Sequence, residues 1–508
     1  MTVHIEGDAG QVVGPVPRRL FGSFVEHMGR SVYTGLYEPG HSTSDERGFR
    51  GDVLELVREL GPTVVRYPGG NFVSGYRWED GVGPDRPVRL DPAWHSVESN
   101  RFGLHEFVAW AEAAGAEVMY AVNLGTRGIQ EAVDVLEYCN HAGGTALSER
   151  RRANGADQPF GFKLWCLGNE MDGPWQIGHK TADEYGRLAA ETARVMRMID
   201  PAVELVVAGS SHADMPTFGE WERTVLRHTA GLVDHISLHA YYQELHGDTD
   251  SYLASGAALD AYIGKVAGII DELGLGGRVG ISVDEWNVWD LRRWNEVDQA
   301  RLAEGGWREH PRIIEDDYTV TDAVVFGSLL SSLLRNVDHV TMANQAQLVN
   351  VIAPIRTEPG GPAWRQSTFH PFRQVAALAG GSSLRLTVDG PRLRTAQHGE
   401  VDLVDVAATA EESGRGAVFL TNRATASPTE VRIRLRGAGF GVYAAETLTA
   451  PEGETRHTVN TAVSQPVRPV PLPGTAVTSD PGGTTITATL PPLSWTVLQL
   501  SPEAGRHA

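Results

Sequence analysis

The segment FKLWCLGNEMDGPW, residues 162–175, joins two contrasting kinds of sequence. Residues 162–167 are mostly apolar, which is typical of a short strand buried on both faces. Residues 168–175 contain two acids, an amide, two glycines and a proline, which predicts a sharp turn. The segment therefore places a carboxylate, Glu170, at the end of a buried strand.

Short apolar runs alternate with longer segments of helical periodicity throughout residues 20–380. Residues 182–199 carry an apolar stripe, and Thr181 followed by Glu184 matches a capping box at the start of that helix. Eight alternations predict a (β/α)₈ TIM barrel rather than an open doubly wound sheet, and no dinucleotide-binding glycine motif follows the first strand. The expected strands are 20–26, 63–68, 117–123, 162–168, 204–208, 235–241, 279–285 and 340–345.

The pattern changes after about residue 382, where short β-branched runs appear between Gly, Pro and Asn turns. We expect a catalytic barrel over residues 16–383 and an antiparallel β-sandwich over 384–508. An N-terminal strand within residues 1–15 is expected to join the sandwich. Residues 453–483, rich in Pro, Thr and Gly, are predicted to form a long surface loop.

Composition and charge exclude several classes of partner. The net charge is −20 and no basic run interrupts it, which disfavours nucleic acid or an anionic membrane as a partner. No apolar stretch is long enough to span a bilayer, and the first residues lack the pattern of a signal peptide. Two cysteines in 508 residues argue against a disulfide framework, so we expect a cytoplasmic protein.

Polar residues follow most of the predicted strands, where barrel enzymes place their active sites. Glu170 ends the fourth strand and Glu285 the seventh, so both are expected to point into one mouth. Glycoside hydrolysis needs two such groups, an acid for the leaving oxygen and a carboxylate for the anomeric carbon. The alternative is that each glutamate pairs with a neighbouring arginine. This is less favoured because both glutamates adjoin asparagine and tryptophan.

A metal or other cofactor is not expected. His27, His179 and His239 form no His-x-His or His-x-x-x-His set with a matching carboxylate. His239 is expected to orient neighbouring carboxylates, and the other two histidines are expected to be structural. Cys139 and Cys166 are predicted to be buried thiols.

Six segments, spread over the whole predicted barrel, resemble the α-L-arabinofuranosidases of glycoside hydrolase family 51. They are FGSFVEHMGRSVYTGLYEP (21–39), VVRYPGGNFVSGYRWEDGVGP (64–84), LWCLGNEMDGPWQIGHKTADEYG (164–186), ISLHAYY (236–242), DEWNVW (284–289) and AQLVNVIAPI (346–355). The predicted C-terminal β-domain also matches that family. The resemblance implies a glycosidase that acts without a cofactor.

The resemblance also implies roles for individual residues. Glu170 resembles the general acid/base and Glu285 the nucleophile, with Arg66 and Tyr241 holding the nucleophile. Four further residues resemble groups that bind sugar hydroxyls: Glu26, Asn71, Asn169 and Gln347. The motif favours Gln347 over Gln345 for the ligand. Independently of the resemblance, Trp94, Trp175 and Trp289 are candidates for flat faces that meet the sugar, the alternative being ordinary core packing.

We therefore predict a retaining, exo-acting α-L-arabinofuranosidase that acts on arabinose-containing oligosaccharides, with its two carboxyl groups about 5–5.5 Å apart. A β-xylosidase or endo-β-glucanase on the same barrel is the alternative. A non-catalytic sugar-binding protein is less favoured because both glutamates are present. The resemblance implies a homo-oligomer, either a hexamer or a trimer of dimers. Residues 291–317 are predicted to form a lid or a subunit contact.

Overall fold

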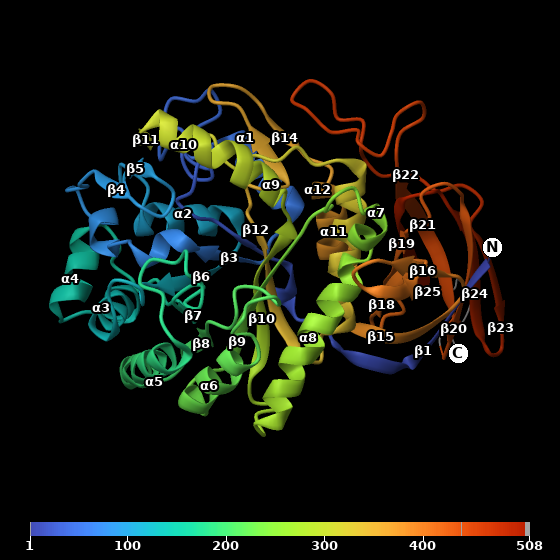
Figure 1. The fold of residues 1–508 in the computed structure, drawn as a ribbon, viewed down its shortest axis with the longest axis horizontal. Helices are drawn as coiled ribbons and strands as arrows, with labels where there is room; N and C mark the ends of the chain where they lie inside the picture. Colours follow the sequence, from blue (N-terminus) through green and yellow to red (C-terminus); the bar gives the residue numbers. More distant parts are fainter. Residues whose placement is uncertain (1, 438, 503–508) are drawn as a thin grey trace.

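Eight parallel strands form a closed barrel in the computed structural model, which describes residues 2–437 and 439–502 (Figure 1). Every predicted barrel strand overlaps an observed one. The strands are β2 (Gly22–Phe24), β3 (Val64–Tyr67), β6 (Glu117–Val122), β7 (Leu164–Leu167), β8 (Glu204–Val207), β9 (His235–Tyr242), β10 (Gly280–Val288) and β12 (Val340–Ala346). Pairing of β12 with β2 closes the ring, so all eight carboxyl ends open on one side.

Helices connect the strands and cover the barrel. The longer ones are α1 (Gly51–Leu60), α2 (Leu104–Ala114), α3 (Ile129–Asn140), α5 (Ala182–Ile199), α6 (Glu220–Thr229), α8 (Ser255–Glu272), α11 (Val320–Arg335) and α12 (Phe369–Leu378). The predicted capping box is present at α5: Thr181 Oγ1 accepts a hydrogen bond from Glu184 N, and the Glu184 carboxylate accepts one from Thr181 N. Tyr185 and Met196 on the predicted stripe are buried.

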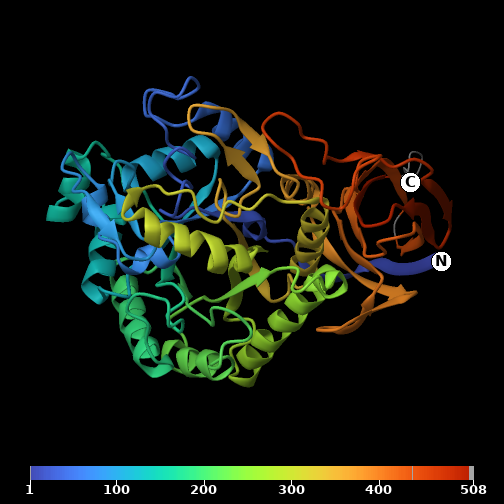
Figure 2. The same ribbon diagram turned by 45° about the horizontal axis from the view of Figure 1, so that its top comes forward.

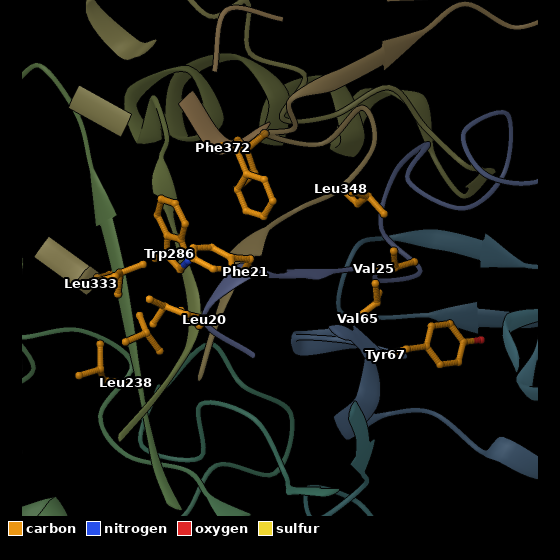
Figure 3. Packing of buried hydrophobic residues seen from close by; sticks show 14 of the residues in the cluster. Leu20, Phe21, Val25, Val65, Tyr67, Leu238, Trp286, Leu333, Leu348 and Phe372 are labelled. Atoms are coloured by element: carbon orange, nitrogen blue, oxygen red, sulfur yellow. The ribbon is translucent and has the colours of Figure 1, made fainter. Parts of the chain in front are cut away.

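The apolar core continues from the barrel strands to the surrounding helices. Trp286 of β10 is fully buried, and Figure 3 shows Leu20, Phe21 and Phe372 around it. Its ring centroid lies 4.7 Å from that of Phe326 in α11. Truncating such a side chain to alanine costs about 3–5 kcal/mol, so Trp286 anchors the strand that carries Glu285.

A second, mostly antiparallel sheet of ten strands lies beside the barrel (Figure 1). The N-terminal strand β1 (Thr2–Pro15) joins it, antiparallel to β15 (Ser382–Asp389) and parallel to β20 (Thr429–Arg436). The other strands are β18 (Val404–Ala410), β19 (Gly416–Asn422), β21 (Phe440–Leu448), β22 (Val470–Pro471), β23 (Ala476–Asp480), β24 (Gly483–Leu490) and β25 (Ser494–Pro502). The sheet curls on itself, because Phe440 N donates to Thr484 Oγ1 over 2.9 Å although β21 and β24 lie far apart in strand order.

Helix α11 connects the two parts through packing and a buried ion pair. Trp495 of β25 lies against Gly327, where a Cβ atom would collide with the indole ring. Asp405 of β18 pairs with Arg335 of α11 over 2.6 Å and with Arg423 over 3.1 Å. Asp405 and Arg423 are buried and Arg335 is half-buried, so loss of either arginine would leave the Asp405 carboxylate less well compensated.

Two segments predicted as loops contain more structure than expected. Residues 453–483 are not one continuous loop, because β22 and β23 pair there with β21 and β24. The segment 291–317 contains α9 (Leu291–Arg293), a π-helical turn (Trp294–Asp298), α10 (Gln299–Gly305) and β11 (Arg308–Glu309). It follows β10 and lies over the open end of the barrel in Figure 2. No helix in residues 2–437 and 439–502 has the length and apolar character needed to cross a membrane.

Candidate active site

Glu285, on β10, lies buried in the barrel mouth with both carboxylate oxygens held. Arg66 Nη1, at the end of β3, donates to Glu285 Oε1 over 2.7 Å. The Tyr241 hydroxyl, on β9, donates to Glu285 Oε2 over 2.6 Å. The structure thus brings together the three residues that the sequence grouped from separate strands.

The surroundings of Glu285 favour its ionised form. Burial by itself would raise the pKa of the carboxyl group. The positive charges of His239 and Arg66, together with the Tyr241 hydrogen bond, outweigh burial and lower the pKa below its ordinary value. The group is therefore a carboxylate at neutral pH, as a nucleophile must be.

Glu170 follows β7 at the turn predicted from the sequence. Its φ of 43° is in the left-handed region, which non-glycine residues rarely adopt. Both oxygens of its carboxyl group are held: Trp175 Nε1 donates to Oε2 over 2.6 Å, and His239 Nδ1 lies 2.8 Å from Oε1. The strained turn and these two contacts aim the carboxyl group at the mouth.

His239 connects the two glutamates. Its Nδ1 lies 2.8 Å from Glu170 and 3.7 Å from Glu285. Burial would lower the pKa of His239, but the two carboxylates raise it above its ordinary value. One ligand atom from each of the three residues lies within 4.8 Å of the others, a grouping that could hold a cation. The sequence shows no metal-ligand spacing here, because three different strands supply the residues, and His239 lies beside both carboxyl groups that it was expected to orient.

Glu26, at the end of β2, lines another wall of the site. Its Oε1 accepts hydrogen bonds from Phe72 N and Trp94 Nε1, each at 2.9 Å, and Gln347 Nε2 lies 3.3 Å from Oε2. Burial, and then the charge of Glu285, raise the pKa of Glu26 to about 8. Gly70 has to lack a side chain, since a Cβ atom there would collide with the Glu26 carboxyl group.

The predicted amide residues also converge on this mouth. Arg66 Nη2 donates to Asn169 Oδ1 over 2.6 Å, and Asn169 Nδ2 lies 3.4 Å from Asn71 Oδ1. Gln347 contacts Glu26, whereas Gln345 bonds to Ser23 and the Ile352 carbonyl. Gln347 is therefore the glutamine that faces the predicted site.

The tryptophans differ from one another in burial. Trp94 is buried, and its ring centroid lies 5.9 Å from that of Trp294, a residue that the sequence reasoning did not single out. Trp289 packs edge-on against Tyr241 at 5.2 Å. Trp175 is 48% exposed, whereas Trp165 and Met171, close to Glu170 in sequence, are fully buried. Trp175 acts through its indole N–H.

The remaining histidines and cysteines lie outside this group. His27 is buried between the Glu98 carboxylate and the Tyr67 hydroxyl, at 2.9 and 2.8 Å, which fits a structural role. Cys139 and Cys166 are buried free thiols, and burial raises the pKa of both. Cys166 Sγ lies 3.9 Å from Asp284 Oδ2.

Comparison with known proteins agrees with this geometry. Two family profiles match the chain, "Alpha-L-arabinofuranosidase 1 domain" over residues 56–255 and "Alpha-L-arabinofuranosidase C-terminal domain" over 284–494. An exo-α-(1→6)-L-arabinofuranosidase of Bifidobacterium longum is 54% identical, over 96% of this chain and 95% of its own length. An intracellular exo-α-(1→5)-L-arabinofuranosidase of Streptomyces lividans is 53% identical, over 98% of this chain and 75% of its own length.

Solved structures show the same similarity over both parts of the fold. A family 51 α-L-arabinofuranosidase from Bifidobacterium longum has a TM-score of 0.91 and 43% identity, covering 98% of this chain and 99% of its own. The α-L-arabinofuranosidase of Thermotoga maritima, solved with arabinose, has a TM-score of 0.85 and 32% identity, with the same coverage. This chain belongs to the α-L-arabinofuranosidases of glycoside hydrolase family 51.

Proposed function

We propose that this glycoside hydrolase is a retaining, exo-acting enzyme that releases terminal non-reducing α-L-arabinofuranosyl residues from arabinan- and arabinoxylan-type oligosaccharides. The observation that carries the proposal is the closeness of Glu170 and Glu285, which each offer a carboxylate oxygen within 4.8 Å of the other. Retaining glycosidases hold their carboxyl groups about 5–5.5 Å apart, and inverting ones about 6.5–9.5 Å to admit a water. The spacing supports a covalent intermediate.

In the first step Glu285 bonds to the anomeric carbon as the glycosidic C–O bond breaks, and Glu170 protonates the leaving oxygen, which departs as an alcohol. In the second step Glu170 takes a proton from water, which attacks that carbon and releases Glu285. Arg66 and Tyr241 keep Glu285 ionised and fix both of its oxygens. His239 contacts both carboxyl groups and so orients Glu170 toward the leaving group.

The sugar ring is bound by the polar groups around this pair. Glu26, Asn71, Asn169 and Gln347 bind its hydroxyls, and Trp94 and Trp289 provide apolar walls. Because the pKa of Glu26 is raised to about 8, its carboxyl group is mostly protonated at neutral pH. It can then donate a hydrogen bond to a sugar hydroxyl as well as accept one.

The recognised unit is the terminal arabinofuranosyl group rather than one linkage. Two relatives of nearly equal identity are named for different linkages, α-(1→5) and α-(1→6). Several relatives are also named intracellular, and we propose that this enzyme likewise acts inside the cell, on oligosaccharides already taken up.

Two measurements test the proposal. A panel of aryl glycosides that differ only in the sugar should be hydrolysed when the sugar is α-L-arabinofuranose. Preference for xylose or glucose would favour the β-xylosidase or endo-β-glucanase alternative, and no hydrolysis would indicate a binding protein. NMR of the first-formed anomer should show retention, and predominant inversion would remove Glu285 as the nucleophile.

We also propose a domain division and an assembly. The barrel domain spans residues 16–383 and the β-sandwich domain 384–508, joined by strand 1–15; residues 1, 438 and 503–508 lie outside the described part. The curled sheet supports a two-layered sandwich. The assembly is a homo-oligomer, a hexamer or trimer of dimers, which light scattering on purified protein would test.

A further inference from the structure

Trp175 is a half-exposed side chain that contacts the acid/base residue directly. Its indole Nε1 donates a hydrogen bond to Glu170 Oε2 over 2.6 Å, although 48% of the residue is exposed. The ring lies nearly parallel to that of His212, with the two centroids 6.2 Å apart. It also lies over Gly173, where a Cβ atom would come 2.6 Å from the indole Cε2. Because half of the residue faces solvent, the indole has room to move off the carboxyl group.

The two partners of the Glu170 carboxyl group differ in how firmly they are held. His239 Nδ1, 2.8 Å from Oε1, belongs to strand β9, and this residue is only 3% exposed. A buried side chain of a barrel strand cannot leave its place without disturbing the packing around it. Trp175 lies beyond the end of β7, outside any helix or strand. Of the two oxygens of Glu170, Oε2 is therefore the one whose partner can give way.

The contact between Trp175 and Glu170 competes with proton transfer to the leaving group. An indole N–H can only donate, and hydrogen bonds to an ionised acceptor are roughly twice as strong as those to a neutral one. The oxygen that carries the acid proton is a hydroxyl, and it has to point this proton at the leaving oxygen. A proton on Oε2 thus weakens the indole bond and brings the leaving oxygen to the side of the carboxyl group that the indole covers.

We propose that Trp175 is a positioning residue that covers Glu170 Oε2 in the free enzyme and is displaced by the glycosidic oxygen when the substrate binds. The inference rests on the proposed function, which gives Glu170 the acid/base role. The indole N–H stabilises the carboxylate of the free enzyme, and its release in the substrate complex favours the protonated acid that the first step needs. In the second step the attacking water takes the place of the glycosidic oxygen, so the indole gives way again.

Two substitutions remove the contact in different ways. Trp175→Phe deletes the N–H and keeps an aromatic ring beside His212. Gly173→Ala keeps the N–H, but the added methyl group pushes the indole off the carboxyl group. Both substitutions leave the ionisable groups that face Glu170 from several elements, namely His239 and Tyr241 of β9, Glu285 of β10, Tyr262 of α8 and Asp172 of the same turn. Trp307→Phe is the matched control, because Trp307 is 42% exposed and stacks on a different ring, that of His95.

The test is the pH dependence of kcat/KM and of kcat with arabinobiose. Its sugar leaving group needs a proton, so the first step limits turnover. The basic limb of kcat/KM reports the acid of the free enzyme, and that of kcat reports the acid of the substrate complex. In Trp175→Phe and in Gly173→Ala the basic limb of kcat/KM should move to higher pH by about one unit, because a hydrogen bond to a charged group changes an equilibrium about tenfold or more. The basic limb of kcat should stay in place.

Three outcomes overturn the inference and leave the proposed function standing. Equal displacement of both limbs would mean that the indole remains on Glu170 in the substrate complex. A kcat/KM limb that stays in place in either variant, with melting curves showing that the variant is folded, would mean that the N–H does not stabilise the carboxylate. An equal displacement in Trp307→Phe would mean that the contact is not the cause. Failure of the wild type to hydrolyse arabinobiose would overturn the proposed function itself.

Discussion

Tyr241→Phe removes one hydroxyl group from the site and keeps the ring that packs on Trp289. That hydroxyl is the hydrogen-bond donor to Glu285 Oε2 at 2.6 Å, while Arg66 remains on Oε1. A hydrogen bond to a charged group contributes about 1.5–3 kcal/mol, and 1.36 kcal/mol corresponds to one pH unit of pKa. Because the bond stabilises the ionised form, its loss should raise the pKa of Glu285 by about one to two pH units.

The assay is kcat/KM for an aryl α-L-arabinofuranoside measured across the acid range. Since Glu285 must be ionised to attack, activity is lost as pH falls through its pKa. The acid limb of the variant should therefore move to higher pH by the same one to two units, roughly. Tyr242→Phe is the matched control, because Tyr242 is the next residue of β9 and its hydroxyl is not the one that bonds to Glu285.

Two results would refute this reasoning. An acid limb that stays in place in Tyr241→Phe would mean that the hydroxyl does not stabilise the ionised nucleophile. An equal displacement in Tyr242→Phe would mean that the effect comes from the strand as a whole and not from the 2.6 Å contact.

Three further predictions follow from the same site. Glu170→Ala should lower the rate of hydrolysis of natural oligosaccharides on the order of 10²–10⁴-fold, but it should still form the covalent intermediate from a nitrophenyl arabinofuranoside, and azide should restore the breakdown of that intermediate. Glu285→Ala should abolish hydrolysis of both substrates. Equal impairment of Glu170→Ala on both substrates, without rescue by azide, would contradict the assignment. The melting temperature of Glu26→Gln should rise relative to that of the wild type, on the order of a few degrees, as pH increases from about 5 to 9. The pKa of Glu26 in the folded protein is about 8, above the ordinary 4.5, so folding disfavours the ionised form and the wild type loses stability over that range. Melting curves at several pH values measure this, and a constant difference would refute it. Removal of metal ions with EDTA should leave turnover unchanged, because the chemistry proposed for Glu170 and Glu285 uses a proton and a free carboxylate. Loss of activity with EDTA that added zinc restores would overturn this mechanism.

Local sequence determined the secondary structure of the barrel closely. Apolar runs of strand length, several of them ended by Gly, Pro or Asn, can be buried on both faces only in a parallel sheet covered by helices. The capping box at Thr181 and the stripe ending near Ile199 likewise gave the limits of α5 without reference to any neighbour. The pairing of β22 and β23 could not be predicted from residues 453–483, because their partners lie in other strands.

The site divides in the same way. That Glu170 and Glu285 would share a mouth followed from sequence alone, since the carboxyl ends of parallel barrel strands lie on one side. The family resemblance implied that Arg66 and Tyr241 hold Glu285, but the geometry of the contacts did not follow from the sequence, because hydrogen bonds depend on side-chain positions set by residues distant in the chain. The motif favoured Gln347, and His239 was expected to orient carboxylates, but only the tertiary structure fixed the contacts: His239 Nδ1 lies near both carboxyl groups, Gln347 Nε2 lies beside Glu26, and the Trp175 indole N–H donates to Glu170.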